Sequence, residues 1–115
     1  MAGGDLDPAR GGVDNGVVTR LADHEIDSGL ETLPGWTRVG DEITREYRLP
    51  SFADAVAFVV QIGFMAEAAD HHPDLDIRWR TVRIALSTHS EGGITPKDLE
   101  LAGQIEIAAG RSRAE

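Results

Sequence analysis

One apolar stretch, Phe52–Ala69, constrains the fold of this chain more than any other feature. Ser51 can cap a helix at this point by accepting a hydrogen bond from the first free backbone amides, and Asp54 completes a capping box. Pro73 lies beyond the stretch, and a helix cannot pass a proline without losing a backbone hydrogen bond. The pattern therefore predicts one long helix that is apolar over most of its circumference.

A helix of this kind needs cover on more than one side. We expect its core-facing row to comprise Phe52, Val56, Val59, Ile62 and Ala66. The other apolar residues suggest contact with a second subunit. No apolar run reaches the roughly 18 residues that a membrane span needs, so we predict no membrane partner.

Weaker patterns predict the elements before the long helix. Apolar residues at helical spacing predict a first helix over about 18–33, and Pro34-Gly35 cannot continue it. Alternating residues predict two strands, over 36–39 and 43–49. Gly40-Asp41 between these strands is typical of a hairpin turn.

After the long helix the alternation continues and then changes parity at Arg80-Thr81, which predicts a tight turn and a second hairpin. Thr95-Pro96 is a strong helix start, and Gly110 is expected to stop that last helix. Three residues of the second hairpin are expected in the core: Trp79, Ile84 and Leu86.

The predicted fold class is α+β, in the order α-β-β-α-β-β-α, with a four-stranded antiparallel sheet covered by helices on one face. Residues 1–16 hold five glycines and little apolar surface, so we predict a flexible N-terminal tail. One domain is expected over 17–110, and 111–115 is predicted to be a short tail that frays.

Composition narrows the possible functions. Twenty acidic residues against eleven basic ones give a formal charge of −9, which opposes binding to nucleic acid or to an anionic membrane surface. The chain has no cysteine, which excludes disulfides, thiolate metal sites and cysteine nucleophiles. The N-terminus has neither the basic start nor the apolar stretch of a signal peptide, so we expect a cytoplasmic protein.

Three of the four histidines lie near one end of the predicted second hairpin. His71 and His72 follow the long helix, and His89 follows the fourth strand. The start of one antiparallel strand neighbours the end of the next, so we expect these imidazoles to meet at one edge of the sheet. Glu67 precedes His71 by four residues, a helical spacing at which a carboxylate can orient an imidazole. His24 has no such neighbours and is expected to be exposed.

Two other interpretations of these histidines are open. A single histidine at a helix C-terminus usually binds free carbonyls and complements the helix dipole. Three imidazoles and a carboxylate could also hold zinc, although the usual pair of histidines at i and i+4 on a helix is missing. Proton transfer is the favoured role, and we predict no metal.

These residues also resemble a known family. The matching segments are Glu67…Asp70-His71-His72-Pro73, then Trp79…Val82…Leu86-Ser87-Thr88-His89, then Gly93-Ile94-Thr95…Asp98…Leu101-Ala102. Together with Gly35-Trp36 upstream, they look like pterin-4a-carbinolamine dehydratases over about residues 20–109. His-His-Pro followed by Thr-His at this distance is the specific part of the pattern.

The resemblance implies removal of water from a 4a-hydroxytetrahydropterin, the carbinolamine formed in pterin-dependent hydroxylation, to give quinonoid dihydropterin during tetrahydrobiopterin recycling. Histidine suits this acid–base chemistry because its ordinary pKa lies near neutrality. The family pattern assigns catalysis to His71, His72 and His89, without a cofactor. Residues implied to line the pterin pocket are Glu67, Asp70, His71, His72, Ser87, Thr88, His89 and Ser90. Trp36 either covers the ring or lies in the core.

The resemblance also implies partners. Family members assemble as homodimers or homotetramers, and a pterin-dependent hydroxylase is the expected source of the substrate. The alternative function is a non-catalytic module that binds pterins or another protein, similar to the dimerisation cofactor role known in the family.

Overall fold

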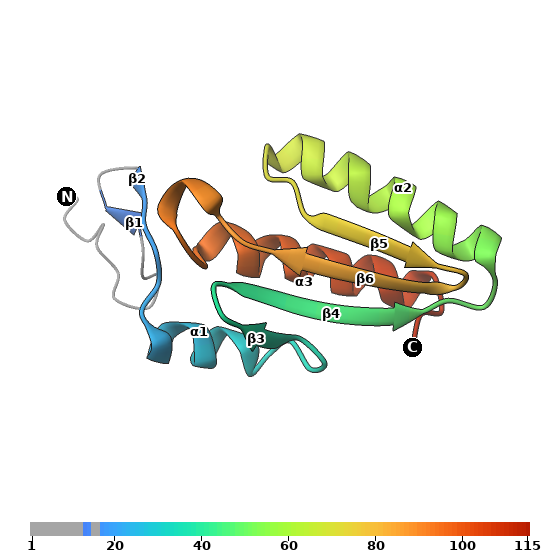
Figure 1. Ribbon diagram of the computed structural model, residues 1–115, viewed down its shortest axis with the longest axis horizontal. Coiled ribbons are helices and arrows are strands. Elements are labelled where there is room, and N and C mark those ends of the chain that lie inside the picture. Colours follow the sequence, from blue (N-terminus) through green and yellow to red (C-terminus); the bar gives the residue numbers. More distant parts are fainter. Residues whose placement is uncertain (1–12, 15–16) are drawn as a thin grey trace.

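The computed structural model describes residues 13–14 and 17–115. In this part of the chain, three α-helices and a four-stranded antiparallel sheet follow one another in the predicted order (Figure 1). The elements are α1 Asp23–Leu30, β3 Thr37–Val39, β4 Glu42–Arg48, α2 Phe52–Ala69, β5 Asp74–Arg78, β6 Thr81–Leu86, a short 3₁₀ helix η3 His89–Glu91, and α3 Pro96–Arg111. A two-residue ladder of β1 Val13–Asp14 with β2 Val17–Val18 precedes them.

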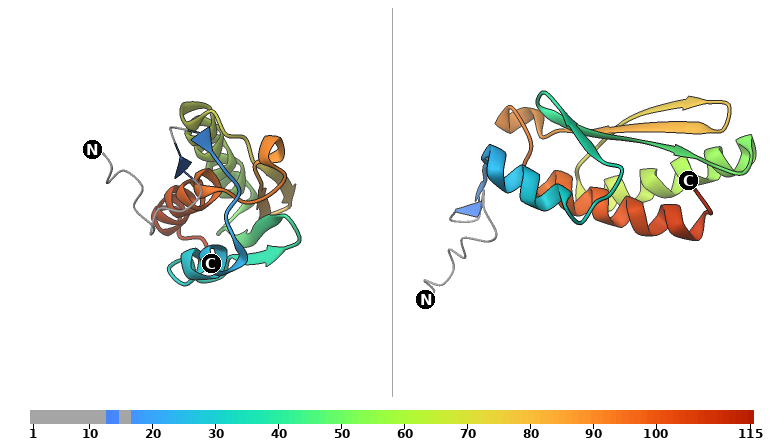
Figure 2. Two further views of the ribbon diagram at one scale, coloured as in Figure 1. Left: turned by 90° about the vertical axis from the view of Figure 1, so that its left-hand side faces the viewer. Right: turned by 90° about the horizontal axis from the view of Figure 1, so that it is seen from below.

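The sheet has the strand order β3-β4-β6-β5, and every neighbouring pair is antiparallel. Helices α2 and α3 pack side by side on one face of it (Figure 2), which confirms the predicted fold class. In the β5–β6 hairpin Asp74 is paired with Ala85. The segments that carry the three histidines therefore leave the sheet at the same end.

The core lies between the helices and the inner face of the sheet. Alternate residues of β4 and β6 point inward because side chains of a strand alternate between its two faces. Fully buried members of this core include Ile43, Tyr47, Val82, Ile84, Leu86, Phe58, Ile62, Leu101 and Ile105. Burying each such side chain contributes about 1.5–3 kcal/mol, so the core fixes the helices against the sheet.

The first helix is shorter than the predicted 18–33. The Leu21 N–H donates to the Ile94 carbonyl at 2.8 Å, and Ala22 is extended, so the chain enters α1 only at Asp23. The Glu25 carboxylate accepts a hydrogen bond from the Ala22 N–H at 2.8 Å and caps the helix. His24 is exposed, as predicted.

The predicted core row of α2 is partly wrong. Phe52 and Val56 are 54% and 39% exposed, and Val59 is half-buried. The residues that face the core are Ala55, Phe58, Ile62 and Ala66. When a helix is apolar on all sides, its sequence does not indicate which side faces the core. Packing against α3 and the sheet determines which row is buried.

Helix α2 also departs from the expectation about membrane spans. Its 18 residues have a mean hydropathy of 1.5, enough by length and composition to cross a membrane, and only 22% of them are buried. In this fold one row of the helix packs against α3, β5 and β6. Most of its apolar surface is left outside the core.

Trp79 is not a core residue, contrary to prediction: it is 70% exposed. The β5–β6 turn consists of Trp79 and Arg80, one residue earlier than predicted, because Arg78 is paired with Thr81. Trp79 has a φ of 52°, in the left-handed region that favours glycine. The change in the alternation of apolar residues therefore marks the turn, and Trp79 is part of that turn.

The two predicted tails differ in outcome. The last residues do not fray: α3 continues through Gly110 to Arg111, and Arg48 and Glu115 exchange two backbone hydrogen bonds of 2.8 Å. Those bonds attach 111–115 to the end of β4. The predicted N-terminal tail lies outside the described residues over 1–12 and 15–16.

Candidate active site

The site is organised by a carboxylate of α3, that of Asp98, which is fully buried. One of its oxygens contacts His71 Nε2 at 2.5 Å. The other accepts hydrogen bonds from the Thr88 hydroxyl and the Thr95 N–H, each at 2.9 Å. A buried carboxylate is tolerated only when such donors compensate for its lost hydration. Asp98 thus ties the end of α2 and the end of β6 to the start of α3.

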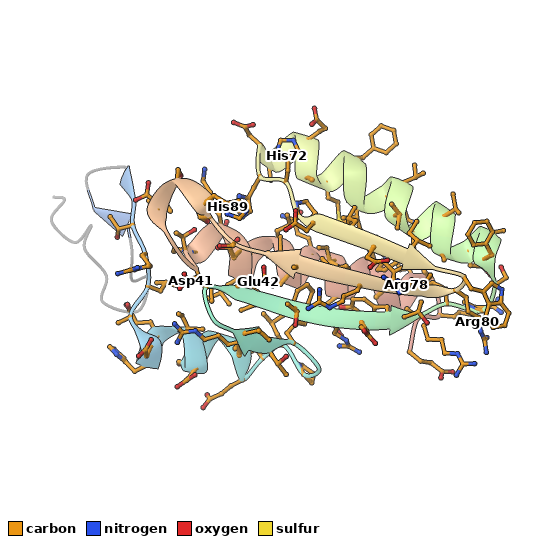
Figure 3. The ribbon with its side chains drawn as sticks, viewed as in Figure 1. Asp41, Glu42, His72, Arg78, Arg80 and His89 are labelled. Atoms are coloured by element: carbon orange, nitrogen blue, oxygen red, sulfur yellow. The ribbon has the colours of Figure 1, made fainter. Side chains whose placement is uncertain are left out.

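This arrangement presents two further histidines to solvent. His72 follows His71, and His89 follows Thr88, so each comes directly after a residue anchored to Asp98. Figure 3 shows His72 and His89 at the same end of the sheet, beyond the start of β5 and the end of β6. His71 is 8% exposed, whereas the other two are exposed. The three histidines lie at the same end of the sheet, and they differ in their exposure to solvent.

The predicted partner of Glu67 is wrong. Glu67 contacts His72 Nε2 at 2.7 Å rather than His71. The reason is the end of α2: Asp70 adopts the left-handed conformation with a φ of 50°, and its N–H donates back to Glu67 and Ala66. Because the helix ends before His71, this residue does not lie one helical turn after Glu67. It points inward to Asp98 instead, and His72 contacts Glu67.

The residues around His89 are placed by the turn after β6. Thr88 N–H donates to Gly93 O at 2.9 Å, which closes a loop around η3. Ser87 Oγ donates to Asp41 O at 2.8 Å, and Ser90 is exposed on η3. Ser87 and Thr88 are thus held by other parts of the chain, whereas the side chains of His89 and Ser90 are accessible.

Trp36 lies in the core and not with the histidines. It is 4% exposed, and its indole N–H donates to Tyr47 Oη at 3.1 Å and to Glu106 at 3.3 Å. Glu106 also accepts from the Tyr47 hydroxyl and pairs with Arg45 at 3.0 Å. Of the two alternatives for Trp36, the structure favours the buried one.

Two further observations define the site. Among residues 13–14 and 17–115, no three histidine or acidic side chains are grouped closely enough to hold a metal ion. Asp98 also caps α3, because its carboxylate accepts a hydrogen bond from the Thr95 N–H. Its contact with His71 spans 27 residues, and no local pattern in the sequence signals it.

Comparison with known families identifies the chain. Residues 19–108 match the family model of the pterin 4 alpha carbinolamine dehydratases. The chain belongs to this family. A Roseiflexus sp. (strain RS-1) protein with the provisional name pterin-4-alpha-carbinolamine dehydratase is 57% identical over 90 residues, covering 78% of this chain and 97% of its own length. A Mycobacteroides abscessus protein with the same provisional name is 54% identical over 91 residues, covering 79% and 97%.

Solved structures agree with this assignment. A transcriptional coactivator/pterin dehydratase from Brucella melitensis superposes with a TM-score of 0.78 at 35% identity, covering 80% of this chain and all of its own. A pterin dehydratase-like protein identified as a RuBisCO assembly factor in the alpha-carboxysome has a TM-score of 0.55 at 18% identity, covering 65% and 87%. The second likeness shows the shared fold alone.

Proposed function

We propose that this pterin-4a-carbinolamine dehydratase homologue removes water from a 4a-hydroxytetrahydropterin by histidine acid–base catalysis, in the cytoplasmic recycling of tetrahydrobiopterin. The observation that supports this most is the pair of accessible imidazoles, His72 and His89, at one end of the sheet. A pterin-dependent hydroxylase would supply the carbinolamine. No cofactor takes part in the proposed reaction.

The reaction requires two proton transfers. One imidazolium gives its proton to the 4a hydroxyl group, the C4a–O bond breaks, and water leaves. A second imidazole accepts the proton of the neighbouring ring N–H, whose electrons form the new C=N bond of quinonoid dihydropterin. The net change is loss of one water, and exchange with solvent restores both histidines. Imidazole is suited to both steps because its ordinary pKa is near neutrality.

The site residues take different parts in this proposal. His72 and His89 exchange protons with the substrate, and Glu67 orients His72 through their 2.7 Å contact. His71 is buried against Asp98, so it would fix the position of His72. Asp70, Ser87, Thr88 and Ser90 surround the same end of the sheet and would bind the edge of the pterin through backbone groups.

The decisive assay generates the carbinolamine in situ with a pterin-dependent hydroxylase and follows quinonoid dihydropterin by absorbance. The wild type should accelerate its formation, and His72→Ala and His89→Ala should each slow it about a hundredfold, the usual size of lost acid–base catalysis. His24→Ala is the matched control, because His24 is exposed on α1. No acceleration by the wild type would favour the alternative, a module that binds pterins or protein without turnover.

We also propose that the chain forms a homo-oligomer through α2. Phe52, Val56, Val60 and Phe64 recur every four residues and are 54%, 39%, 51% and 74% exposed, so they form one apolar stripe. Such a stripe on a surface helix indicates a protein interface, and an equivalent helix of a second copy offers a matching apolar surface.

Light scattering tests this assembly. The wild type should be at least dimeric at micromolar concentration, and Phe64→Asp should shift it toward the monomer. Val39→Asp is the control, because Val39 is equally apolar and 54% exposed but lies on β3, away from α2. A monomeric wild type would refute the proposal.

A further inference from the structure

A second group of charged side chains lies at the end of the sheet opposite the histidines. There a cavity of about 320 Å³ is lined by Arg48, Leu49, Pro50, Arg80, Arg113 and Glu115. Figure 3 shows Arg80 at this end of the molecule, far along the sheet from His72 and His89. The proposed dehydration uses none of these residues.

The cavity carries an excess of positive charge. Three arginines line it against one acidic side chain, that of Glu115, whereas the whole chain has a net charge of −9. Among the described residues, none of the three arginines is in an ion pair. Other arginines of the fold are paired, such as Arg38 with Asp23 at 2.7 Å.

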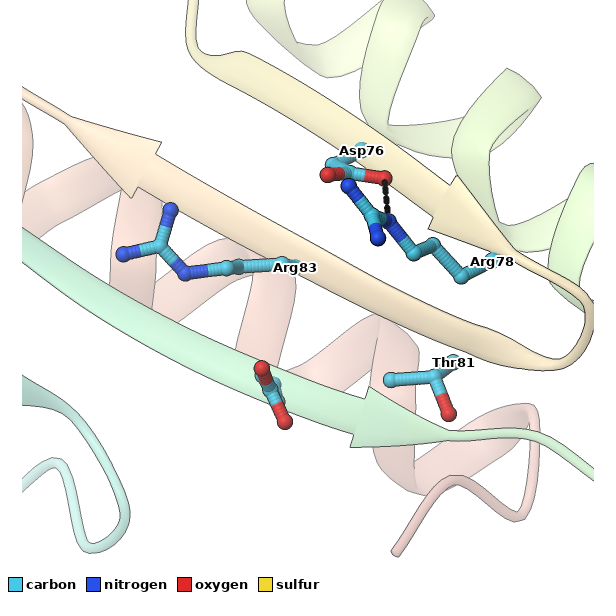
Figure 4. A pocket seen from close by; sticks show the side chains of 5 residues that line it. Asp76, Arg78, Thr81 and Arg83 are labelled. Atoms are coloured by element: carbon cyan, nitrogen blue, oxygen red, sulfur yellow. Dashed lines mark hydrogen bonds and ion pairs between the residues drawn. The ribbon is translucent and has the colours of Figure 1, made fainter.

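The adjoining hollow on the open face of the sheet shows the contrast (Figure 4). It is lined by Glu46, Asp76, Arg78, Thr81 and Arg83, so two acids balance two arginines. Arg78 Nε donates to Asp76 at 3.4 Å. Charge there is internally compensated, and the excess of arginine is confined to the neighbouring cavity.

The guanidinium of Arg80 is incompletely satisfied. Its Nε is buried and has no hydrogen-bond partner within the described part of the chain. Its Nη1 donates only at long range, to Leu49 O at 3.4 Å and Pro50 O at 3.5 Å. A buried donor of a charged group left without an acceptor is costly. An oxyanion in the cavity would supply the missing acceptors after a small turn of this side chain.

Neighbouring contacts support Arg80 and join the backbone segments that carry the other two arginines. The Trp79 ring lies 5.2 Å from the guanidinium carbon of Arg80, a cation–π contact that supports the group from outside. Arg113 has a φ of 59°, and it is followed by the two 2.8 Å backbone hydrogen bonds between Glu115 and Arg48. The three arginines thus come from three separate segments that the fold ties together.

We propose that this cavity is a binding site for the phosphate group of a small anion. A guanidinium presents parallel N–H donors that match two phosphate oxygens, and phosphate near pH 7 carries enough charge to offset the excess of the three arginines. The exposed Trp79 ring beside Arg80 is placed to contact an organic group attached to that phosphate. The site lies apart from the dehydratase site and can be occupied independently of it.

The test is a titration of the full chain with sodium phosphate at constant ionic strength, followed by ¹H–¹⁵N spectra. The chain has two tryptophans, Trp79 in contact with Arg80 of the cavity and the buried Trp36. Saturable movement of the Trp79 indole signal, with the Trp36 signal unmoved, is expected. The phosphate group could belong to a phosphate monoester or to free inorganic phosphate, and a parallel titration with phenyl phosphate distinguishes the two. Tighter binding than inorganic phosphate indicates a monoester, and equal binding indicates the free anion.

Variants decide whether the cavity is responsible. Arg113→Gln should weaken phosphate binding at least about tenfold, equivalent to about 1.4 kcal/mol. Arg80→Gln should do the same, and Arg113→Gln keeps the test valid if loss of Arg80 disturbs the hairpin. Arg78→Gln removes the same charge two residues away and should change the affinity less than about twofold, since Arg78 lines the other hollow.

Three results would overturn the proposal. They are a shift that sodium chloride reproduces at the same ionic strength, a shift that never saturates, and equal effects of Arg78→Gln and Arg113→Gln. Each would mean that phosphate only screens surface charge. The dehydratase rate of Arg113→Gln tests the proposed function separately from phosphate binding, because Arg113 lies outside the histidine site.

Discussion

Removing the Asp98 carboxylate tests the central argument about the site. In Asp98→Ala the buried Thr95 N–H and His71 Nε2 lose their acceptor, while the Thr88 hydroxyl can turn to Thr95 Oγ1 at 2.8 Å. Two orphaned buried groups cost about 1–3 kcal/mol each. We therefore expect Asp98→Ala to lower the free energy of unfolding by about 4 kcal/mol.

Asp98→Asn separates stability from site geometry. The amide oxygen can still accept from Thr95 N–H, so the helix cap survives, but the amide nitrogen then faces His71 Nε2 as a second donor. Unless His71 changes tautomer, that contact is lost, and we expect a cost of about 1–2 kcal/mol. The dehydratase rate should fall with it, because His71 positions His72.

The assay is urea unfolding followed by circular dichroism, together with the dehydratase rate. Glu100→Ala is the control, because Glu100 is exposed on the same helix and its loss should change stability by less than about 0.5 kcal/mol. A cost below about 1 kcal/mol for Asp98→Ala would refute the claim that this carboxylate joins α2, β6 and α3.

Three further outcomes are expected. The pKa of Tyr47 is raised well above its ordinary value, mainly by burial and next by the hydrogen bond to Glu106. The neutral phenol thus contributes stability that is complete below a pH of about 10 and lost above it. Absorbance at 295 nm, which reads this one tyrosine of the chain, should change together with circular dichroism as the protein unfolds in alkali, and ionisation without unfolding would contradict this. The Arg38 guanidinium lowers the pKa of Asp23 by hydrogen bonding and by charge, so Arg38→Gln should return that pKa toward its ordinary value in carboxyl NMR titrations. Trp79→Gly removes an unfavourable φ of 52° and should raise the free energy of unfolding by about 1 kcal/mol in urea titrations, whereas a loss of stability would show that the cation–π contact outweighs the strain.

Local patterns were sufficient for the order of elements. Capping signals at Ser51 and Thr95 mark the starts of α2 and α3 because side chains there bind the first free amides, a contact within three residues. Gly40 in a two-residue turn marks the first hairpin for a similar local reason. Each of these signals depends only on residues that are close in the sequence, so the fold class could be predicted.

Long-range contacts could not be predicted in this way. The inner row of α2 depends on packing, since Phe52 and Phe58 are equally apolar and only the second is buried. The pairing of His71 with Asp98 depends on how α2 ends, because the left-handed Asp70 turns the chain before the helical register reaches His71. The sequence placed these histidines at one end of the sheet, and tertiary structure decided which of them are exposed.

Three non-glycine residues in the described part of the chain have a positive φ: Asp70, Trp79 and Arg113. Glycine would adopt each conformation without the energetic cost that a side chain brings, so each of these side chains lowers the stability of the fold. Asp70 directs His71 inward at one end of the sheet. Trp79 supports Arg80, and Arg113 faces the same cavity, at the other end. The unfavourable backbone conformations therefore lie at the two ends of the sheet where we propose the dehydratase site and the phosphate site.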